Sequence, residues 1–311
     1  MNSLGERIKA EARRLGFHLA GITTAEQPAH FEVYEAWLSA DLHGEMAYLA
    51  SESARQKRAD PRQILPECRS ILVLGMRYPS PRCGFVEEVQ PGAWHPEQPG
   101  IVQVSAEPLG RVASYAWGDD YHDLLSERLQ ALTAFIEKQI GHSVPHRWYT
   151  DTGPVLERDL AQRAGLGWIG KNTCLIHPHL GSYFLLAEIL LGLELDPDPP
   201  FPFDFCGSCT RCLQACPTSC ILPNRTIDAR RCIAYLTIEF KGIIPTELRS
   251  GMGEWIFGCD ICQEVCPWNQ RFADPQGEAE QQAAGTFVPR PGVLRPRLVE
   301  ELSLTLPAFN R

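Results

Sequence analysis

Apolar residues recur along the first part of the chain with the spacings of helices and of a buried strand. Residues 2–16 and 31–39 place apolar side chains three and four positions apart, which predicts two amphipathic helices. SILVLGMRY, residues 70–78, is a nearly continuous apolar run, and such a run is typical of a strand buried on both faces. The first eighty residues therefore contain both helix and strand patterns.

The same alternation continues between residues 111 and 195. RVASYA, residues 111–116, predicts a strand, and a long amphipathic helix is expected from residue 119 until Gly141 ends it. DTGPVLERDLAQRAG, residues 151–165, predicts a further helix in which Pro154 takes the first position and Gly165 marks the end. Strands, helices and glycine-rich loops thus alternate, and we expect an α/β (α+β) fold with a mixed sheet.

A proline-rich segment is the best candidate for a domain boundary. LDPDPPFPFDF, residues 195–205, holds four prolines, which cannot donate to a sheet ladder and which stiffen the chain. We therefore expect a first domain over residues 1–200 and a second over residues 201–275. Residues 276–311, rich in proline, glutamate and glutamine, are expected to form a short C-terminal tail.

Cysteines dominate the second part of the chain. Nine of the twelve cysteines lie between residues 206 and 266. The motif CGSCTRCLQACP, residues 206–217, has the CxxCxxCxxxCP spacing of bacterial ferredoxins, in which the fourth cysteine ligates the other cluster of a pair. CDICQEVCP, residues 259–267, repeats the CxxCxxxCP spacing with which the first motif ends. Cys232 lies between the two motifs. Together these positions supply eight thiolates, enough for two [4Fe–4S] clusters.

The crossed ligation of such motifs predicts two sets of four ligands. Cys220 breaks the count, and we expect it to be an ordinary buried or surface thiol, like Cys68, Cys83 and Cys174. Zinc is the alternative, but a zinc site favours two CxxC pairs and has no use for a third cysteine at the same spacing. The predicted ligands are Cys206, Cys209, Cys212 and Cys266 for the first cluster, and Cys216, Cys232, Cys259 and Cys262 for the second.

The net charge and the lengths of the apolar segments argue against several classes of protein. The formal net charge of −9 argues against a protein that coats nucleic acid through general phosphate contacts. Residues 55–82 nevertheless carry seven basic and two acidic side chains, which fits either a face for a polyanion or an ordinary solvated surface. The N-terminus has no apolar segment of a secretory signal, and the apolar run at residues 182–195 is too short to span a bilayer. We expect a cytoplasmic protein without a membrane anchor, whose reduced thiols bind metal.

Several stretches of the chain together resemble the epoxyqueuosine reductase family. They are YAWGDDYH at residues 115–122, YTDTGPVLERDLAQRAGLGWIGKNT at 149–173, RRCIAYLTIEFKG at 230–242 and the two cysteine motifs. The resemblance runs from about Gly44 to Asn269 and keeps the order and spacing of all of them. This combination is far more specific than any one motif.

The resemblance implies a fold, a reaction and cofactors. It implies a nitroreductase-like domain that binds cobalamin, followed by a ferredoxin-like domain with two [4Fe–4S] clusters. Members of the family reduce epoxyqueuosine to queuosine at the wobble position of tRNA, the last step of queuosine biosynthesis, with cob(I)alamin that receives electrons from the clusters. The DxHxxG signature that places a histidine below cobalt is absent from the sequence, so base-off cobalamin is expected. The implied partners are tRNA carrying epoxyqueuosine and an external electron donor, and we expect a monomer.

Asp151 matches the proton donor of the family. An aspartate just before a helix is most often an N-cap, but with Pro154 at the first position the cap would be Gly153. The epoxide oxygen needs a proton as it leaves, and Asp151 is therefore the expected catalytic residue. The family pattern implies cofactor contacts at Arg58, Tyr115, Ala116, Asp151, Lys171, Asn172 and Ala234. Structural or solvated roles are the alternative for these residues, and at Ala234, where the family has serine, one hydrogen bond to the cofactor is expected to be lost.

Two other functions stay open at this stage. A reductive dehalogenase acting on a small organohalide would share the cofactors, but that class usually carries a twin-arginine export signal, which is missing here. A plain iron–sulfur electron carrier would have no need for the stretch at residues 149–173. His43 and His122 are expected to be ordinary polar residues. The basic residues beside the clusters are candidates either for contact with tRNA phosphate or for ordinary surface charge, namely Arg230, Arg231 and Lys241.

Overall fold

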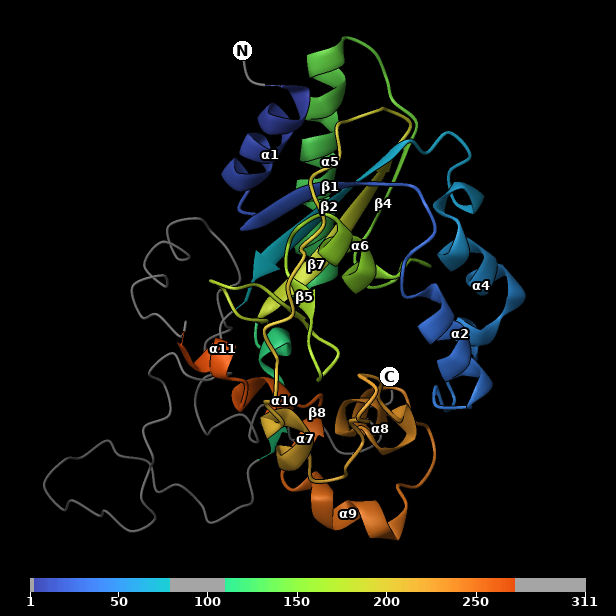
Figure 1. Cartoon of the computed structure of the whole chain (residues 1–311), viewed down its shortest axis with the longest axis vertical. Helices are drawn as coiled ribbons and strands as arrows, with labels where there is room; N and C mark the ends of the chain where they lie inside the picture. The colour runs from blue at the N-terminus through green and yellow to red at the C-terminus, as the bar shows by residue number, and fades with distance from the viewer. Residues whose placement is uncertain (1–2, 79–109, 272–311) are drawn as a thin grey trace, which may run out of the picture.

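A four-stranded sheet lies at the centre of the computed structural model, which describes residues 3–78 and 110–271 (Figure 1). The α/β class predicted from the sequence is confirmed. Within these residues the expected mixed sheet is not found, because every pair of neighbours in the main sheet is antiparallel, and the parallel pair lies in a separate small sheet of β3 and β8. An apolar pattern marks a buried strand but does not record its direction. The strand order is β1 (Leu19–Thr24), β2 (Ser70–Arg77), β7 (Phe184–Leu191) and β4 (His146–Tyr149).

Helices cover both faces of this sheet. α1 (Leu4–Arg14) and α5 (Tyr121–Ile140) share one hydrophobic core with the face that carries Leu72. α6 (Glu157–Arg163) packs on the opposite face, which carries Ile71. Successive side chains of a strand point to opposite faces, so β2 and β7 must be apolar almost throughout. The continuous apolar run predicted as a buried strand at residues 70–78 is thus confirmed.

The predicted end of α5 is confirmed, whereas two other predicted boundaries are wrong. Gly141 closes α5 in the left-handed conformation, with φ of 83°, as predicted. α6 begins only at Glu157, so the prediction that Pro154 takes the first helical position is wrong. The strand expected over residues 111–116 is also shorter, because β3 spans Arg111–Val112 and a 3₁₀ turn, η2 (Ser114–Ala116), follows it.

Smaller elements flank the sheet. α2 and α4 lie along its right-hand side in Figure 1. The remaining elements of the first two hundred residues are α2 (Phe31–Ser39), α3 (Ala47–Ala50), α4 (Glu52–Ala59), η1 (Pro61–Gln63), β5 (Trp168–Ile169) and β6 (Leu175–Ile176). No helix within residues 3–78 and 110–271 combines the length and the apolar character that crossing a membrane requires.

The cysteine-rich part is built from short helices below the sheet in Figure 1. None of these helices is longer than seven residues, so few of them bury a wide apolar face. Its elements are α7 (Arg211–Ala215), η3 (Ala229–Arg231), α8 (Ile233–Ile238), α9 (Thr246–Met252), β8 (Trp255–Phe257), α10 (Ile261–Glu264) and α11 (Pro267–Arg271).

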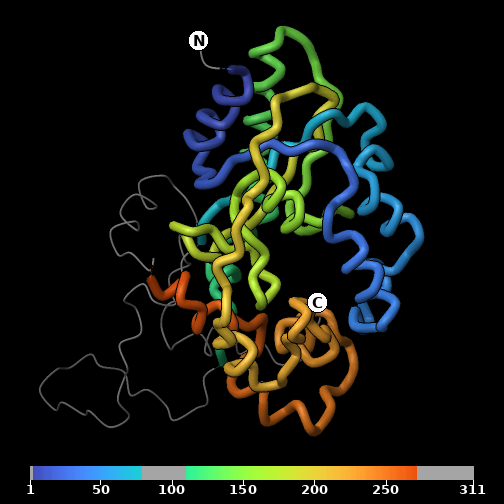
Figure 2. Tube along the Cα trace, viewed as in Figure 1, coloured from blue at the N-terminus to red at the C-terminus, as the bar shows by residue number. Residues whose placement is uncertain are grey.

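The proline-rich segment runs from the sheet to the cysteine-rich part without regular structure (Figure 2). It is tied to the first domain through Asp198, whose carboxylate accepts hydrogen bonds from the Lys9 ammonium and the Ile22 backbone N–H, both at 2.8 Å. Residues from both sides of the segment also share a small core, in which Trp37 and Tyr115 pack with Ile233 and its neighbours. The division at residue 200 stays a prediction, and the tail at residues 276–311 lies outside the described residues.

Candidate functional site

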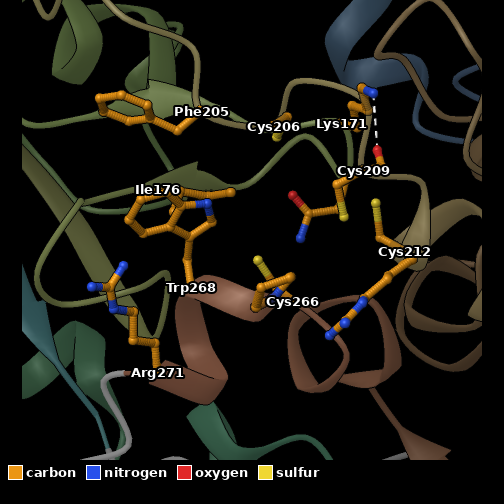
Figure 3. A pocket seen from close by; sticks show the side chains of 12 residues that line it. Lys171, Ile176, Phe205, Cys206, Cys209, Cys212, Cys266, Trp268 and Arg271 are labelled. Atoms are coloured by element: carbon orange, nitrogen blue, oxygen red, sulfur yellow. Dashed lines mark hydrogen bonds between the residues drawn. The ribbon is translucent and has the colours of Figure 1, made fainter.

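The four cysteines predicted to hold the first cluster line one cavity of about 220 Å³ (Figure 3). Cys206 and Cys209 lie in the loop before α7, Cys212 lies within α7, and Cys266 directly precedes α11. Burial raises the pKa of the Cys266 thiol to about 11 and also raises that of Cys212. Thiols with raised pKa values stay neutral until a metal centre supplies positive charge and deprotonates them.

The cavity fits a multinuclear cluster better than a zinc ion. A single zinc ion requires four ligand atoms at about 2.0–2.3 Å from one point. Among the residues that the structure describes, no three His, Cys, Asp or Glu side chains converge on a point in that way. The four thiols instead surround a space, as an iron–sulfur cube requires. Aromatic rings line one side of it, where Phe205 and Trp268 pack with their centroids 5.5 Å apart.

Lys171 and Asn172 lie between the two cysteine motifs. The Lys171 ammonium donates to the carbonyl oxygens of Gly207 and Cys209, at 2.7 and 2.9 Å, and so fixes the loop that carries two predicted ligands. Asn172 is buried, and its side-chain N–H group donates to the carbonyl oxygen of Cys262 at 3.3 Å. The structure therefore places both residues at the cysteines, and their contact with cobalamin stays a prediction.

Two of the predicted ligands of the second cluster, Cys216 and Cys232, contact a further thiol, Cys220. The Sγ atoms of Cys216 and Cys220 lie 3.4 Å apart, and the backbone N–H of Cys220 also donates to the Cys216 Sγ at 3.4 Å. Hydrogen bonds from the Cys220 thiol lower the pKa of Cys216 to about 5 and that of Cys232 to about 7. Burial raises the pKa of Cys259 to about 12. Cys216 and Cys232 are thus ready to act as thiolate ligands.

Cys262, the fourth predicted ligand of this group, is partly buried. Its thiol hydrogen-bonds with Cys174, which lowers the pKa of Cys174, while the pKa of Cys262 itself is raised. Sequence spacing did not single out either Cys174 or Cys220 for a role beside the ligands. Cys174 and Cys220 lie close to the predicted ligands only in the folded chain, and the number and spacing of cysteines in the sequence do not reveal this.

Asp151 occupies an exposed loop directly after β4. Its backbone is left-handed, with φ of 60°, and its side chain is 68% exposed. The Tyr121 hydroxyl donates to Oδ2 at 2.9 Å, and the Asp151 backbone N–H donates to Oε1 of Glu157 at 2.8 Å. The N-cap position of α6 is Leu156, so the capping role considered for Asp151 is excluded. Non-glycine residues in this conformation cluster at functional sites, where neighbours hold them in place.

His122 also approaches Asp151, although the sequence suggested an ordinary polar residue. Its Nδ1 lies 2.8 Å from Oδ1 of Asp120, and its Nε2 lies 4.0 Å from Oδ2 of Asp151. Within the described chain, His122 Nε2 is buried and has no hydrogen-bond partner. The signal was present in the sequence as YAWGDDYH, because the start of α5 brings Asp120, Tyr121 and His122 to one place.

Tyr115 connects Asp151 with the second group of cysteines. The Tyr115 ring meets Tyr121 edge-on, with centroids 6.2 Å apart, and packs against Phe257 of β8 at 6.1 Å. The neighbouring Ser114 donates its backbone N–H to Oδ2 of the buried Asp260, at 2.7 Å. Asp260 stands between two predicted ligands in the sequence, so the turn beside Asp151 is bonded directly to the cysteine motif.

The other predicted cofactor contacts come from three separate elements, α4, η2 and α8. Arg58 is only 8% exposed; its guanidinium donates to the carbonyl oxygen of Ala54 and lies 5.6 Å from the centroid of the Tyr34 ring. Ala116 follows Tyr115 in η2 and donates its backbone N–H to Ala113. Ala234 is half-buried in α8.

The surroundings of Asp151 fit a large ligand held by hydrogen bonds. Asp151 presents an exposed carboxyl group and His122 an unpartnered nitrogen, as described above. Tyr48 is 58% exposed, donates to Glu239 at 3.4 Å, and has its pKa raised to about 12 by burial and by nearby carboxylates that include Asp151. Polar groups from separate elements thus lie near the Asp151 carboxyl group, next to the turn that leads to the second group of cysteines.

Known proteins share both parts of this arrangement. A family model described as a 4Fe-4S double cluster binding domain matches residues 205–269, and one described as epoxyqueuosine reductase QueG, DUF1730, matches residues 58–152. Over 298 residues the chain is 41% identical to the epoxyqueuosine reductase of Pseudomonas aeruginosa, which covers 96% of this chain and 75% of the relative. The chain belongs to the epoxyqueuosine reductase family.

Further members of the family agree in sequence and in structure. The Synechocystis epoxyqueuosine reductase is 37% identical over 92% of this chain and 89% of its own length. A crystal structure of an epoxyqueuosine reductase with an epoxyqueuosine-modified tRNA-Tyr stem loop superposes with a TM-score of 0.77 at 31% identity, covering 99% of this chain and 74% of the other. A structure of the Bacillus subtilis enzyme with its catalytic aspartate loop swung out of the active site gives 0.69 at 28% identity, with 97% and 81% covered. The predicted family and the two-cluster domain are confirmed.

Proposed function

We propose that this protein reduces epoxyqueuosine to queuosine at the wobble position of tRNA, as the last step of queuosine biosynthesis. The observation that carries the proposal is the arrangement of Asp151. Its exposed carboxyl group is held by Tyr121, and the adjoining turn at Ser114 and Tyr115 is bonded to the motif of the second group of cysteines. Membership of the family supports the proposal, since the relatives are named epoxyqueuosine reductase.

The reaction removes oxygen from an epoxide. Two electrons and two protons enter, both carbon–oxygen bonds break, a carbon–carbon double bond forms and water leaves. When bound, two [4Fe–4S] clusters and a base-off cobalamin supply the electrons and a reactive cobalt centre for this reduction. The residues proposed to hold the first cluster are Cys206, Cys209, Cys212 and Cys266, and those for the second are Cys216, Cys232, Cys259 and Cys262.

In this proposal, Asp151 gives a proton to the departing oxygen. Tyr121 donates to Oδ2, which leaves Oδ1 to carry the proton toward the substrate. Glu157 accepts the backbone N–H of Asp151 and fixes the position of the loop. In the Bacillus subtilis relative a catalytic aspartate loop is seen swung out of the active site. A loop held by these two hydrogen bonds is suited to the same movement.

The remaining expectations complete the proposal. The protein would act in the cytoplasm as a monomer, with residues 1–200 as the catalytic domain, residues 201–275 as the cluster domain and an external protein as electron donor. The tRNA-bound structure of a relative supports tRNA carrying epoxyqueuosine as the substrate. The residues proposed to contact cobalamin are Arg58, Tyr115, Ala116, Asp151, Lys171, Asn172 and Ala234.

Exchanging Asp151 for asparagine tests the proposed function. Protein loaded anaerobically with iron, sulfide and cobalamin is mixed with reductant and epoxyqueuosine-containing tRNA, and the nucleosides are analysed. We expect Asp151→Asn to lower the rate of queuosine formation by about 10²–10⁴-fold, because the amide cannot act as a general acid. Iron content and the cobalamin absorption spectrum should stay unchanged.

Asp123→Asn is the matched control, because Asp123 is an exposed carboxylate of α5 near the same site. Its rate should equal that of the wild type. Equal rates for wild type and Asp151→Asn would refute the role of Asp151. A fully loaded wild-type protein that forms no queuosine would refute the function itself.

A further inference from the structure

Exposed aromatic rings lie beside the cavity of the first cysteine group. Phe203 and Phe205 are 60% and 45% exposed. Their rings stack with centroids 5.6 Å apart, and Phe205 packs against Trp268 of α11 at 5.5 Å. Phe205 and Trp268 also line the cavity, together with Cys206 and Cys266 (Figure 3). Single exposed apolar residues are ordinary, whereas adjoining ones with a polar rim mark a site of interaction.

The proline-rich segment holds these rings toward solvent. Phe201 is half-buried and stacks on the buried ring of Trp168, with centroids 5.8 Å apart. Its backbone N–H donates to the carbonyl oxygen of Gln162 in α6 at 2.9 Å. Phe203 follows two residues later, after Pro202, whose ring restricts the backbone. The exposed rings are thus held in place before any partner binds, which lowers the entropy cost of binding.

Cationic side chains surround these rings, although the chain as a whole has a formal net charge of −9. Lys171, Arg211 and Arg271 line the same cavity, and the described residues that line it include no acidic side chain. Arg211 and Arg271 are exposed. The acidic residue of the adjoining segment, Asp204, forms an ion pair with Arg225. The surroundings of the rings are therefore locally positive, which favours a negatively charged partner.

The two cysteine groups connect this surface with the surroundings of Asp151. α7 carries Cys212 of the first group and is followed directly by Cys216 of the second. The motif of the second group is bonded through Asp260 to Ser114, in the turn beside Asp151. Electrons from outside the protein therefore have a route that begins at the first group, where its cavity meets the exposed rings.

We propose that this surface docks an acidic protein that carries one electron at a time. We call it the donor face and define it by Phe203, Phe205, Trp268, Arg211 and Arg271. The inference rests on the proposed function, because that reaction takes two electrons from an external donor. Each encounter oxidises the carrier protein by one electron and reduces this protein by one. Two encounters supply both electrons, and no proton is transferred at the donor face.

The composition of the donor face favours a protein over tRNA. An aromatic centre with arginine at its rim is typical of protein–protein interfaces, and a transient electron-transfer contact needs only a small area. The modified base of tRNA has to reach Asp151, and the described contacts of that side chain and its loop lie outside the donor face, namely Tyr121, Glu157 and His122. A separate face for the carrier lets tRNA stay in place while electrons arrive.

Binding of a flavodoxin with negative net charge tests the donor face without turnover. The flavodoxin is kept oxidised, so that it cannot transfer an electron, and its affinity for the iron-loaded protein is measured by biolayer interferometry. We expect Phe203→Ser and Arg211→Glu each to weaken binding at least about fivefold. Wild-type affinity should fall about tenfold between roughly 0.05 and 0.5 M salt, and Arg211→Glu should show a smaller dependence on salt.

Two surface variants are matched controls for this measurement. Ile243→Ser removes another exposed apolar side chain, since Ile243 is 84% exposed. Arg69→Glu changes the net charge as Arg211→Glu does, at a side chain that is 65% exposed and lies before β2. Both controls should bind flavodoxin as the wild type does. If Arg211→Glu loses iron, Phe203→Ser still decides the question, because Phe203 lies outside both cysteine motifs.

The second test separates docking from the chemistry at Asp151. With reduced flavodoxin at a concentration below its Kd, queuosine formation in Phe203→Ser should be at least about fivefold slower than in the wild type. With dithionite, a small reductant that needs no docking surface, the two proteins should react at equal rates. A Phe203→Ser variant that is equally slow with both reductants would contradict the proposal.

The outcomes also separate the donor face from the proposed function. If flavodoxin does not bind the wild type, or binds both variants equally well, the donor face is wrong and the function stands. If the wild type forms no queuosine even with dithionite, the function is wrong, whereas weaker flavodoxin binding by the variants still supports the docking. Loss of tRNA affinity in Phe203→Ser would assign the face to tRNA, and a wild-type dimer that dissociates in this variant would assign it to a second copy. Either result overturns the proposal.

Discussion

Cys220 supplies both a thiol and a backbone N–H to the surroundings of Cys216. Hydrogen bonds to the cysteine sulfurs of an iron–sulfur cluster raise its reduction potential, because they stabilise the more negative reduced state. A net hydrogen bond contributes about 0.5–1.5 kcal/mol, and about 59 mV corresponds to 1.4 kcal/mol for one electron. Single residues beside the ligands therefore set the potential at which the second cluster accepts electrons.

We predict that Cys220→Ala lowers the midpoint potential of the second cluster by roughly 20–60 mV. Cys220→Ser keeps a donor of similar size and should shift the potential less. A redox titration followed by electron paramagnetic resonance measures both shifts. Loss of four iron atoms in Cys220→Ala would show instead that Cys220 is a ligand, and an unchanged potential would show that its thiol does not reach the cluster.

For individual residues, the sequence predicted those that lie in fixed motifs. It missed those that only folding brings close to the candidate site. Asp151 could be proposed as the proton donor because it sits in the DTGP stretch. Cys220 and His122 were set aside, since neither cysteine counting nor the frequency of unpaired histidines reports spatial neighbours. The family pattern predicts Lys171 and Asn172 as cofactor contacts, and their hydrogen bonds to the cysteine motifs are additional contacts that the sequence did not indicate.

Among the elements, β7 combines an apolar strand with a buried acid. The pKa of Glu188 is raised in the folded state, so the folded protein binds a proton that the unfolded chain has already released at neutral pH. Stability that depends on this group is present below the unfolded pKa of about 4.3 and falls as pH rises toward the folded value.

We predict that the free energy of unfolding of the wild type decreases between pH 5 and pH 8, by up to about 1.4 kcal/mol per pH unit from this one group. Glu188→Met should show a smaller slope, because an apolar side chain of similar size removes the titration. Urea unfolding at several pH values measures both slopes. Parallel slopes for the two proteins would mean that Glu188 is not the group responsible.

Element positions followed from the sequence more reliably than element ends and strand directions. The apolar run of β2 and the glycine that closes α5 were sufficient to find those elements, whereas the apolar run that contains β7 was used only to exclude a membrane span. The start of α6 was misplaced because the hydrogen bond between Asp151 and Glu157 holds residues 151–156 as a loop, and Pro154 alone cannot show this. Antiparallel pairing of β2 with β7 joins segments more than a hundred residues apart, which no local pattern encodes.

At the scale of the whole molecule, the two parts differ in what stabilises them. The sheet buries a large apolar core on both faces, whereas the cysteine-rich part consists of short helices around thiols. Metal binding to such a part contributes directly to its folding. Family motifs predicted both parts, but the contact of β3 with β8 could not be predicted, since two-residue strands carry no pattern.

We predict that removal of iron with a chelator under reducing conditions speeds amide hydrogen exchange in residues 205–217 and 258–267. The amides of β2 and β7 should keep their protection, because the core of the sheet does not depend on metal. Hydrogen exchange followed by mass spectrometry compares iron-loaded and iron-free protein. A uniform rise in exchange through the sheet would show that the two parts unfold together.

The hydrogen bond from Ser114 to Asp260 joins the turn beside the proposed proton donor to the cysteine motif. Binding events at the two ends of this bond are therefore linked, and linkage is reciprocal. If clusters at the cysteines raise the affinity for cobalamin at the proposed contact Tyr115 by some factor, then bound cobalamin raises the affinity for the clusters by the same factor. Cells short of one cofactor would consequently lose the other from this protein as well, and assembly of the enzyme would respond to the supply of both.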